Sequence, residues 1–463
     1  MPPLSGTMRD LHPPRRPSAM SHAQTLILAA PQILPVVPRN TLLQDHALVI
    51  RDGIIQAIEP RETARANHPD AEYREHPGQV LIPGLINAHT HSGMSLLRGI
   101  GSDHTLMDWL KRYIWPAEGK LLSPEFVRAG TRLSVAEMLR GGTTCFSDMY
   151  LFVEDAARVV DETGIRASLG LTVFDFPTPW ASTADEYFQR GADVVAAWGE
   201  HDRIAFNVAP HAPYTVGDAS LERVAERARE LNAPIHMHVH ETASEVADAL
   251  RDQGERPLAR LARLGMLDQP FIAVHMTQVD DDDLGLLHGR PVSIAHCPES
   301  NLKLASGFCP VTRLQEAGIN VALGTDGTAS NNDLDMIGEM RTAALLAKGV
   351  SGDAAALPAA SALEMATLGS ARALGLDGRI GSLEPGKQAD VVAVDLQALE
   401  LLPAHDPSAQ IVYAATREAV RDVYVAGRPL LRDRELLTLD PQDLRAEADY
   451  WRLRVLETQQ PTA

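Results

Sequence analysis

Pro83-Gly84-Leu85-Ile86-Asn87-Ala88-His89-Thr90-His91 follows the apolar run Val80-Leu81-Ile82, and together they predict a buried strand that ends in two histidines. Side chains two residues apart in a strand point the same way, so the imidazoles of His89 and His91 can face one interior point. Neutral imidazole is the commonest metal-binding side chain. A His-X-His pair alone is weak evidence, so the case depends on whether later strands supply the missing ligands.

Strand-like and helix-like segments alternate through the middle of the chain. Ser220 to Leu231 carries apolar residues at helical spacing, and Ser123-Pro124 pairs a capping serine with proline at the first helical position. Eight alternating units predict an α/β fold, a (β/α)₈ TIM barrel, with catalytic residues at the C-terminal ends of its strands. The expected strands are 81–91, 143–149, 166–174, 203–211, 234–240, 271–276, 291–297 and 321–326.

Short apolar runs separated by turns occupy both ends of the chain. They lie at 25–28, 47–50 and 54–58, with a hairpin signal at Arg51-Asp52-Gly53, and again at 389–394 and 420–427. Neither set is large enough for its own core, so we expect one small β-sandwich domain built from both ends. The expected division is a disordered extension (1–22), the small domain (23–80 and 379–440), the barrel (81–378) and a helical tail (441–463).

The composition of the 463 residues excludes several classes of protein. A formal net charge of -19 argues against a protein that tracks the phosphates of nucleic acid. No apolar segment is long enough to span a membrane. Residues 1–22 lack the apolar region of a secretory signal, and Met8 or Met20 could be the true start. The three cysteines Cys145, Cys297 and Cys309 have no CxxC spacing, which is typical of reduced, buried thiols in a cytoplasmic protein.

Titratable residues recur where the later expected strands end. Because a TIM barrel gathers these strand ends at one face, the pattern predicts an active site there. Scattered structural histidines would not produce this regularity. The residues are His211, then His236, His238, His240 and Glu241, then His275, His296 and Asp326.

This constellation resembles the amidohydrolase superfamily over about residues 25–427. The resemblance is carried by the stretch that ends in His91, by His238-Val239-His240-Glu241-Thr242, by Gly324-Thr325-Asp326-Gly327, and by 381–390 as the return into the small domain. Further motifs are similar to the 5'-methylthioadenosine/S-adenosylhomocysteine deaminase branch. They lie at 108–118, 210–214, 300–304 and 326–332.

Three imidazoles and one carboxylate form the expected metal site: His89, His91, His238 and Asp326. A nitrogen-rich set with an open position suits Zn²⁺, and Fe²⁺ or Mn²⁺ less strongly. Two-metal members of the family carry a bridging lysine on the fourth strand, which here ends in His211, so we expect one ion per subunit. His236, His238 and His240 could all point inward. The resemblance selects His238 and leaves His240 either behind the ligands as a supporting residue or in the wall of the site.

The resemblance also implies the catalytic roles. Asp326 would take the proton of the attacking water, Glu241 would carry a proton to the ring nitrogen, and His275 would hydrogen-bond the nucleophile. Trp109 would offer an apolar face, and Glu118 would accept hydrogen bonds from two ribose hydroxyls. The further residues expected to bind substrate are His211 and Glu241.

One departure concerns the 5' substituent of the nucleoside. Where some members carry an arginine for the homocysteine carboxylate, this chain aligns Leu171, and Arg190 could substitute for it. An apolar wall favours a methylthio group over a zwitterion. We therefore expect 5'-methylthioadenosine first, with S-adenosylhomocysteine or adenosine as further substrates. The resemblance also implies a homo-oligomer, a dimer or tetramer.

Other functions remain open from the sequence. The same metal site could serve a deaminase or chlorohydrolase of guanine, an oxidised purine, a pterin or a triazine, or an enzyme that opens cyclic amides. Glu118 favours a nucleoside, and the missing lysine disfavours the two-metal cyclic amidases. A non-catalytic metal-binding scaffold is disfavoured because Glu241, His275 and Asp326 are all present.

Overall fold

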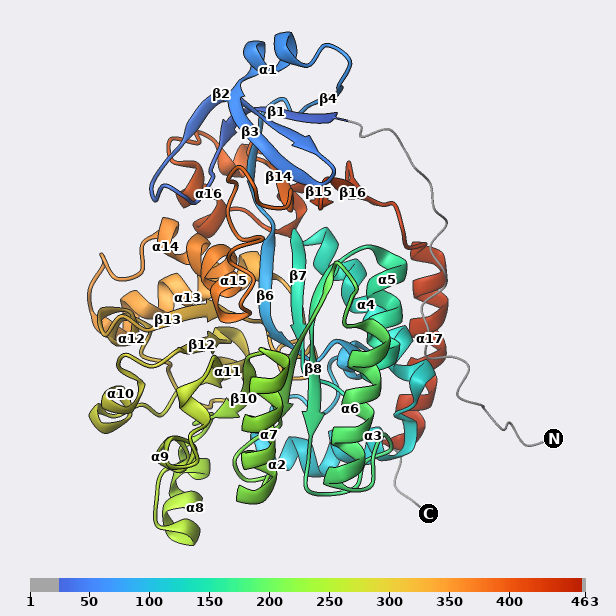
Figure 1. The fold of residues 1–463 in the computed structure, drawn as a ribbon, viewed down its shortest axis with the longest axis vertical. Helices are drawn as coiled ribbons and strands as arrows, with labels where there is room; N and C mark the ends of the chain where they lie inside the picture. Colours follow the sequence, from blue (N-terminus) through green and yellow to red (C-terminus); the bar gives the residue numbers. More distant parts are fainter. Residues whose placement is uncertain (1–24, 460–463) are drawn as a thin grey trace, which may run out of the picture.

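The computed structural model describes residues 25–459, so the extension expected over 1–22 lies outside the described residues. Eight parallel strands follow one another in chain order around a barrel (Figure 1). This confirms the predicted TIM barrel. The strands are β6 (Leu85–Thr90), β7 (Thr143–Asp148), β8 (Arg166–Val173), β9 (Ile204–Pro210), β10 (Ile235–Val239), β11 (Phe271–His275), β12 (Val292–His296) and β13 (Asn320–Leu323).

Helices cover the outside of the barrel. Ser123 caps the first long one by accepting a hydrogen bond from the backbone N–H of Phe126 at 3.2 Å. The α-helices are α2 (Leu106–Trp109), α3 (Trp115–Leu121), α4 (Pro124–Arg140), α5 (Val153–Thr163), α6 (Ala184–Trp198), α7 (Asp218–Leu231), α8 (Ala243–Gln253), α9 (Pro257–Arg263), α10 (Asp281–Leu287), α11 (Pro298–Lys303), α12 (Val311–Glu316), α13 (Met336–Ser351), α14 (Ala359–Glu364), α15 (Ser370–Ala373) and α16 (Pro407–Tyr413). Short 3-10 turns (Ser92–Leu97, Met266–Asp268, Leu399–Leu401 and Arg417–Ala419) and π-turns (Leu110–Ile114 and Met365–Gly369) complete the layer. None of the described helices is long and apolar enough to cross a membrane.

The interior of the barrel is apolar at one end and polar at the other. Alternate residues of β11 point to opposite sides of the barrel wall. Phe271 and Ala273 point outward into the large hydrophobic cluster, whereas Ile272 and Val274 point inward and join a smaller hydrophobic cluster with Leu374. This smaller cluster fills the barrel at the N-terminal ends of its strands. The C-terminal ends carry the histidines.

A buried asparagine joins the last strand of the barrel to the first. The side chain of Asn87 accepts from the backbone N–H of Thr325 at 3.1 Å and donates to its hydroxyl at 2.7 Å. The backbone N–H of Asp326 donates to the carbonyl of His89 at 3.0 Å. Gly324 permits this approach, because a Cβ there would lie 2.7 Å from the backbone nitrogen of His89. Closure of the barrel therefore brings two expected metal ligands together.

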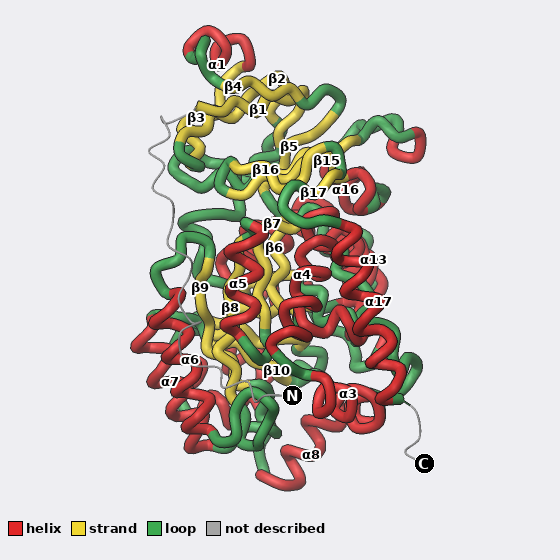
Figure 2. Tube along the Cα trace, turned by 90° about the vertical axis from the view of Figure 1, so that its right-hand side faces the viewer, coloured by secondary structure: helices red, strands yellow, loops and turns green. Residues whose placement is uncertain are grey.

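Both ends of the chain build a second, mixed sheet, as predicted. Its strand order is β17-β16-β15-β14-β5-β1-β2-β3, and β4 pairs with β1. Asp52 and Gly53, both with positive φ, turn the chain between β2 and β3. Figure 2 shows this sheet beyond one end of the barrel. The strands are β1 (Thr25–Ile33), β2 (Leu43–Arg51), β3 (Ile54–Pro60), β4 (Glu72–Glu75), β5 (Gln79–Pro83), β14 (Val391–Asp395), β15 (Val420–Val425), β16 (Arg428–Arg432) and β17 (Glu435–Leu436), with α1 (Arg61–Asn67) between β3 and β4.

The expected strand over 81–91 is two strands that belong to different sheets. β5 pairs with β1 and β14, and β6 begins the barrel after a break at Gly84. A Cβ at Gly84 would lie 2.0 Å from the Thr144 hydroxyl, so only glycine fits where the chain crosses. A buried ion pair secures the same junction, with Nε of Arg166 2.9 Å from Oδ2 of Asp390.

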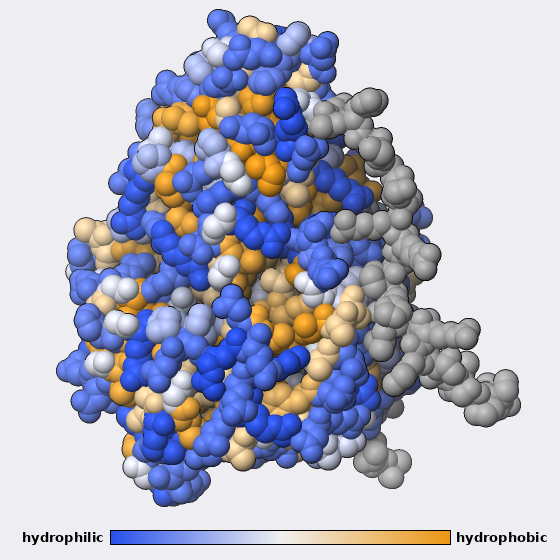
Figure 3. Space-filling model, in the orientation of Figure 1, coloured by the Kyte–Doolittle hydropathy of each residue, from blue (hydrophilic) through white to orange (hydrophobic). Residues whose placement is uncertain are grey.

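The predicted C-terminal helix is α17 (Pro441–Thr458), which packs along the barrel beside α4 (Figures 1 and 2). The rings of Trp451 and Phe126 meet edge to face with centroids 5.1 Å apart. Hydrophilic residues cover most of the face drawn in Figure 3, as the net charge of -19 leads us to expect.

Candidate active site

The expected metal ligands converge at the C-terminal ends of the barrel strands. Nε2 of His89 and Nε2 of His91 lie 3.4 Å and 3.2 Å from Oδ1 of Asp326. The ligand atoms of His89, His238 and His275 lie within 4.8 Å of one another. Strands β10 and β13 end before Glu241 and Asp326, so these carboxylates stand on the turns that follow.

Each of the three expected histidine ligands has a partner at Nδ1. The ring of His91 meets the carbonyl of Met149 at 2.5 Å, and that of His238 meets the carbonyl of His211 at 2.7 Å. For His89 the partner is another imidazole, that of His236, at 3.0 Å. A backbone carbonyl can only accept, so Nδ1 of His91 and of His238 carries the proton and Nε2 faces the site.

Hydroxyl groups orient the carboxylate of Asp326. Ser300 and Ser330 each donate to Oδ2 at 2.7 Å, and the backbone N–H of Gly327 donates to Oδ1 at 2.7 Å. Burial alone would raise the pKa of Asp326, but the adjacent His89 and His91 hold it well below its usual range. Asp326 is therefore a carboxylate that stays ionised at the centre of the site.

The donor set fits a divalent metal ion. Nε2 of His89 is buried and has no hydrogen-bond partner among the described residues, although it faces a carboxylate. Buried polar atoms without partners are rare in folded proteins. The four expected ligands belong to two groups that share His89, one with His91 and Asp326 and one with His238 and His275. Three imidazole nitrogens and one carboxylate oxygen match the ligand preferences of zinc.

Glu241 and His275 lie together beside this donor set. Oε2 of Glu241 is 3.9 Å from Nε2 of His275, whose Nδ1 meets the side-chain oxygen of Asn301 at 2.9 Å. Burial raises the pKa of Glu241, the charge of Asp326 raises it further, and His275 opposes the shift. A carboxyl with a raised pKa is suited to carry a proton near neutral pH.

Two side chains hold the backbone that carries Glu241. The carboxylate of Glu245 accepts from the backbone N–H groups of His240 and Glu241 at 2.9 Å and 2.7 Å. The hydroxyl of Thr277 donates to the carbonyl of Glu241 at 2.7 Å. His240 has a φ of 53°, a strained left-handed conformation that these contacts maintain. The imidazole of His240 accepts from the backbone N–H of Leu258 at 3.2 Å and lies 3.6 Å from Asp283, and the described lining of the cavity does not include it.

Sequence reasoning missed Glu245, although a local signal was present. Thr242 and Glu245 occupy the N-cap and third positions of α8, the spacing of a capping box. The Thr242 hydroxyl accepts from the backbone N–H of Glu245 as that motif requires. The glutamate reaches back beyond the cap to the Glu241 backbone, which the motif alone does not predict.

A cavity of about 260 Å³ opens above the donor set. All the expected site residues except His89 line it: His91, Trp109, Glu118, His211, His238, Glu241, His275 and Asp326. The indole N–H of Trp109 donates to the carbonyl of Ile100 at 3.1 Å. The hydroxyl of Tyr150 donates to Oε1 of Glu118 at 2.7 Å. Tyr150, which the sequence did not single out, thus holds one oxygen of that carboxylate.

The prediction that Leu171 forms a wall of the cavity was wrong. Leu171 packs outward against α6, where a Cβ on Gly191 would lie 3.5 Å from that of Leu171, and the neighbouring Thr172 lines the cavity instead. Arg190 is not among the described residues that line the cavity, and it pairs with Glu186 on the same helix at 2.9 Å. The segment that follows β8 contributes four apolar residues to the lining: Phe174, Phe176, Pro177 and Pro179.

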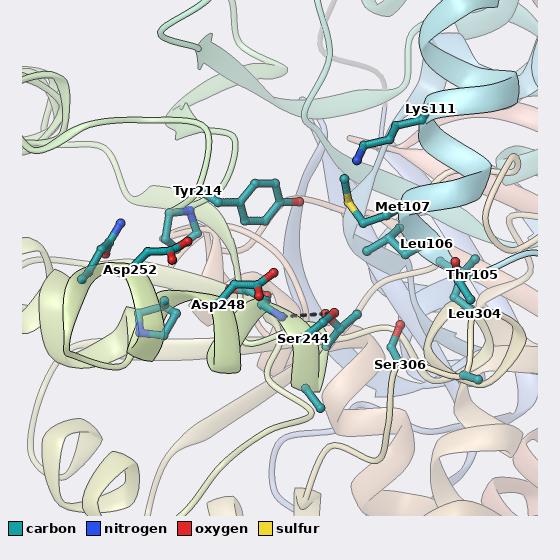
Figure 4. A pocket seen from close by; sticks show the side chains of 18 residues that line it. Thr105, Leu106, Met107, Lys111, Tyr214, Ser244, Asp248, Asp252, Leu304 and Ser306 are labelled. Carbon is teal, nitrogen blue, oxygen red and sulfur yellow. Dashed lines mark hydrogen bonds between the residues drawn. The ribbon is translucent and has the colours of Figure 1, made fainter.

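An outer hollow of about 730 Å³ adjoins this cavity and shares Leu106, Tyr214 and Leu304 with it. Figure 4 shows Lys111 and Met107 on one side of the hollow and Asp248 on the other. Arg251 pairs with the carboxylate of Asp248 at 2.6 Å. The hollow therefore has a larger share of polar lining than the inner cavity that it adjoins.

Comparison with known proteins agrees with this geometry. A profile of the amidohydrolase family matches residues 80–430, which include the whole barrel. The chain belongs to the amidohydrolase family. The resemblance found in the sequence is thereby confirmed.

Relatives of this amidohydrolase carry consistent names. A protein of Teredinibacter turnerae, named 5-methylthioadenosine/S-adenosylhomocysteine deaminase, is 48% identical over 425 residues, covering 92% of this chain and 96% of that one. A protein of Aquifex aeolicus with the same name is 40% identical over 409 residues, covering 88% and 94%.

Solved structures resemble it over nearly their whole length. An adenosine deaminase of Xanthomonas campestris with bound zinc is 50% identical, with a TM-score of 0.90 over 93% of this chain and 98% of that one. A triazine hydrolase of Arthrobacter aurescens, 22% identical with a TM-score of 0.85 over 92% and 99%, shares the fold.

Proposed function

We propose that this amidohydrolase is a zinc-dependent deaminase that converts 5'-methylthioadenosine to the inosine product and ammonia. S-Adenosylhomocysteine and adenosine are its further substrates. One observation carries the proposal: a single cavity is lined by three members of the donor set, His91, His238 and Asp326, and by Glu241, together with an aromatic face and a carboxylate suited to a nucleoside. The names of relatives at 48% identity support the same reaction.

His89, His91, His238 and Asp326 would hold one zinc ion per subunit, and Fe²⁺ or Mn²⁺ suits the same ligands less well. A bound divalent cation lowers the pKa of water and so supplies a nucleophile near neutral pH. The fourth barrel strand ends in Pro210 and is followed by His211, so it offers no lysine to bridge a second ion.

Three side chains move or stabilise protons in the proposed reaction. Asp326 stays ionised and accepts the proton of the attacking water. Glu241 delivers a proton to the ring nitrogen, so that the attacked carbon can become tetrahedral and the amine can leave as ammonia. His275, oriented by Asn301, hydrogen-bonds the nucleophile.

The remaining walls select a nucleoside. Trp109 offers its face to the substrate, and Oε2 of Glu118 is free to accept from the ribose because Tyr150 occupies Oε1. His211 completes this wall. None of the described residues that line the cavity is Lys or Arg, and its aromatic and proline wall suits an uncharged methylthio group. This supports the predicted preference for 5'-methylthioadenosine through residues other than Leu171.

We also propose that the enzyme works in the cytoplasm as a homo-oligomer, a dimer or tetramer, without nucleic acid or membrane. The strong negative charge and the three free, buried cysteines support this setting.

The test follows the loss of the adenine chromophore when zinc-loaded protein meets 5'-methylthioadenosine, S-adenosylhomocysteine or adenosine. Release of ammonia or chloride is measured in parallel with guanine, a pterin and a triazine. We expect rapid conversion of 5'-methylthioadenosine and slower conversion of S-adenosylhomocysteine. Glu118→Ala should raise KM for nucleosides, because it removes the acceptor for the ribose hydroxyls. Zinc-loaded protein that acts on none of the adenine nucleosides but on guanine, a pterin or a triazine would refute the proposal.

A further inference from the structure

Buried polar side chains continue from His89 into the barrel, away from the cavity. Nδ1 of His89 lies 3.0 Å from Nε2 of His236, and Nδ1 of His236 lies 3.2 Å from the Ser147 hydroxyl. The amide of Asn207 donates to the hydroxyls of Ser147 and Ser168 at 3.3 Å and 3.1 Å. All five side chains are fully buried.

The alternation of β10 directs His236 into this interior. Ile235, Met237 and Val239 pack outward in the large apolar cluster. His236 and His238 therefore share the inner face, and His236 lies two residues further from the mouth of the barrel. His236 cannot reach the cavity, whose described lining does not include it.

The hydrogen bond between His89 and His236 can run in either direction, and only one direction leaves His89 able to bind a metal. If His236 donates, the neutral His89 ring carries its proton on Nε2 and has no lone pair for a cation. If His236 accepts at Nε2, His89 carries its proton on Nδ1 and presents the lone pair of Nε2 to the site. A His236 ring that accepts at Nε2 has its own proton on Nδ1, where the hydroxyl of Ser147 can accept it.

His89 thus differs from the other two histidine ligands. Backbone carbonyls, which can only accept, fix the tautomers of His91 and His238. The tautomer of His89 depends on a side chain that could hold either pattern, and that side chain depends in turn on Ser147. A side-chain substitution can therefore change the tautomer and orientation of His89, whereas backbone carbonyls fix those of His91 and His238.

We propose that His236 is a positioning residue, which fixes the tautomer and ring orientation of His89 for metal binding. This rests on the metal site proposed above. Partners of ligand histidines typically contribute about 10- to 100-fold in metal affinity. His236 should contribute within this range without touching the metal or the substrate.

A pair of amide variants tests the proposal. In His236→Gln the side-chain oxygen can reach the position of Nε2 and accept from His89. In His236→Asn the shorter side chain is equally polar but cannot reach. The zinc dissociation constant is measured without substrate by competition with a chromophoric chelator, and Co²⁺-loaded protein reports ligand geometry through its visible absorption. His296→Leu is the control, because it removes a buried imidazole that no described hydrogen bond or ring contact joins to a ligand.

We expect zinc to bind about 10- to 100-fold more weakly to His236→Asn, with an altered Co²⁺ spectrum, whereas His236→Gln and His296→Leu stay close to the parent. Equal zinc affinity for His236→Asn and the parent would overturn the proposal, as would equal losses in the Gln and Asn variants. Thermal unfolding of the zinc-free variants shows whether each is folded. A parent that binds no zinc would overturn both this proposal and the metal site. A parent that binds zinc but deaminates nothing would overturn the proposed function alone.

Discussion

A buried cluster that joins a basic side chain to a carboxylate lies at each end of the barrel, and the two clusters are built differently. At the junction with the terminal sheet, Arg166 donates to both oxygens of Asp390 and to the side chain of Gln388, and the backbone N–H of Ala426 donates to Asp390 at 2.7 Å. At the other end, Asp326 faces His89, whose Nε2 makes no hydrogen bond among the described residues.

The difference separates a structural cluster from a functional one. The junction satisfies its buried charges within the chain, as a buried ion pair must if it is not to destabilise the fold. The site holds a donor set, strained turns and carboxyls with raised pKa, features that serve function at a cost in stability. Changes at the site should therefore cost catalysis, and changes at the junction should cost stability.

The largest expected effect is that of Glu241→Gln. The amide keeps the shape of the side chain but cannot carry the proton, so kcat should fall by about a thousandfold. Steady-state kinetics on 5'-methylthioadenosine measure this change. The melting temperature at neutral pH should stay equal or rise, because a buried carboxyl becomes a neutral group. A variant that keeps its kcat, or that loses activity only because it unfolds, would contradict the claim that changes at the site reduce catalysis and not stability.

Asp390→Ala tests the other end of the barrel. It leaves Arg166 buried without its carboxylate, so the free energy of unfolding in denaturant should fall by about 3 to 5 kcal/mol. The kcat of the folded fraction should match the parent. The double variant Arg166→Met/Asp390→Leu removes both charges and should recover much of the loss. A large fall in kcat with unchanged unfolding would contradict the assignment of this pair to stability.

Glu245→Gln should have an intermediate effect. An amide in place of the carboxylate must turn its NH₂ group toward one of the two backbone N–H groups, so one strong hydrogen bond is lost. Burial raises the pKa of Glu245 to about 7, so the group is partly ionised near neutral pH. The lost hydrogen bond should contribute about 1 to 3 kcal/mol, so kcat should fall about fivefold to a hundredfold as Glu241 loses its position. Zinc affinity, measured in parallel, should not change. Kinetics indistinguishable from the parent would show that the turn holds Glu241 without Glu245.

The smallest effect on selectivity is expected from Leu171→Met. Leu171 faces α6, so the ratio of kcat/KM for 5'-methylthioadenosine over S-adenosylhomocysteine should stay at the parent value. The free energy of unfolding should fall by less than about 1.5 kcal/mol for this volume-conserving change. The matched variant Phe174→Met alters the wall of the cavity and should change the ratio. A shift with Leu171→Met but not with Phe174→Met would restore the sequence-based view of Leu171.

The sequence predicted the strands well because apolar alternation and Gly/Pro boundaries are local signals. The strand ends located the titratable residues, and closure of the barrel does bring His89 and Asp326 together. The division of the first strand at Gly84 was missed, because the steric demand there comes from Thr144, a residue far along the chain.

The errors at the site also have physical causes. Neighbouring residues of a strand point to opposite faces. An alignment that selects Leu171 instead of Thr172 therefore places in the cavity a side chain that points away from it. Glu245, Tyr150 and His236 act by holding other side chains or their backbone. The spacing of Thr242 and Glu245 indicates a helix cap but not the bond to Glu241, and no spacing identifies the contacts of Tyr150 or His236.

The most direct test of the central claim is a zinc titration of metal-free protein, with deamination of 5'-methylthioadenosine measured at each step. One ion held by His89, His91, His238 and Asp326 predicts activity that rises in proportion to bound zinc and stops rising at one equivalent per chain. Full activity in the metal-free protein, or a rise that continues to two equivalents, would contradict the account.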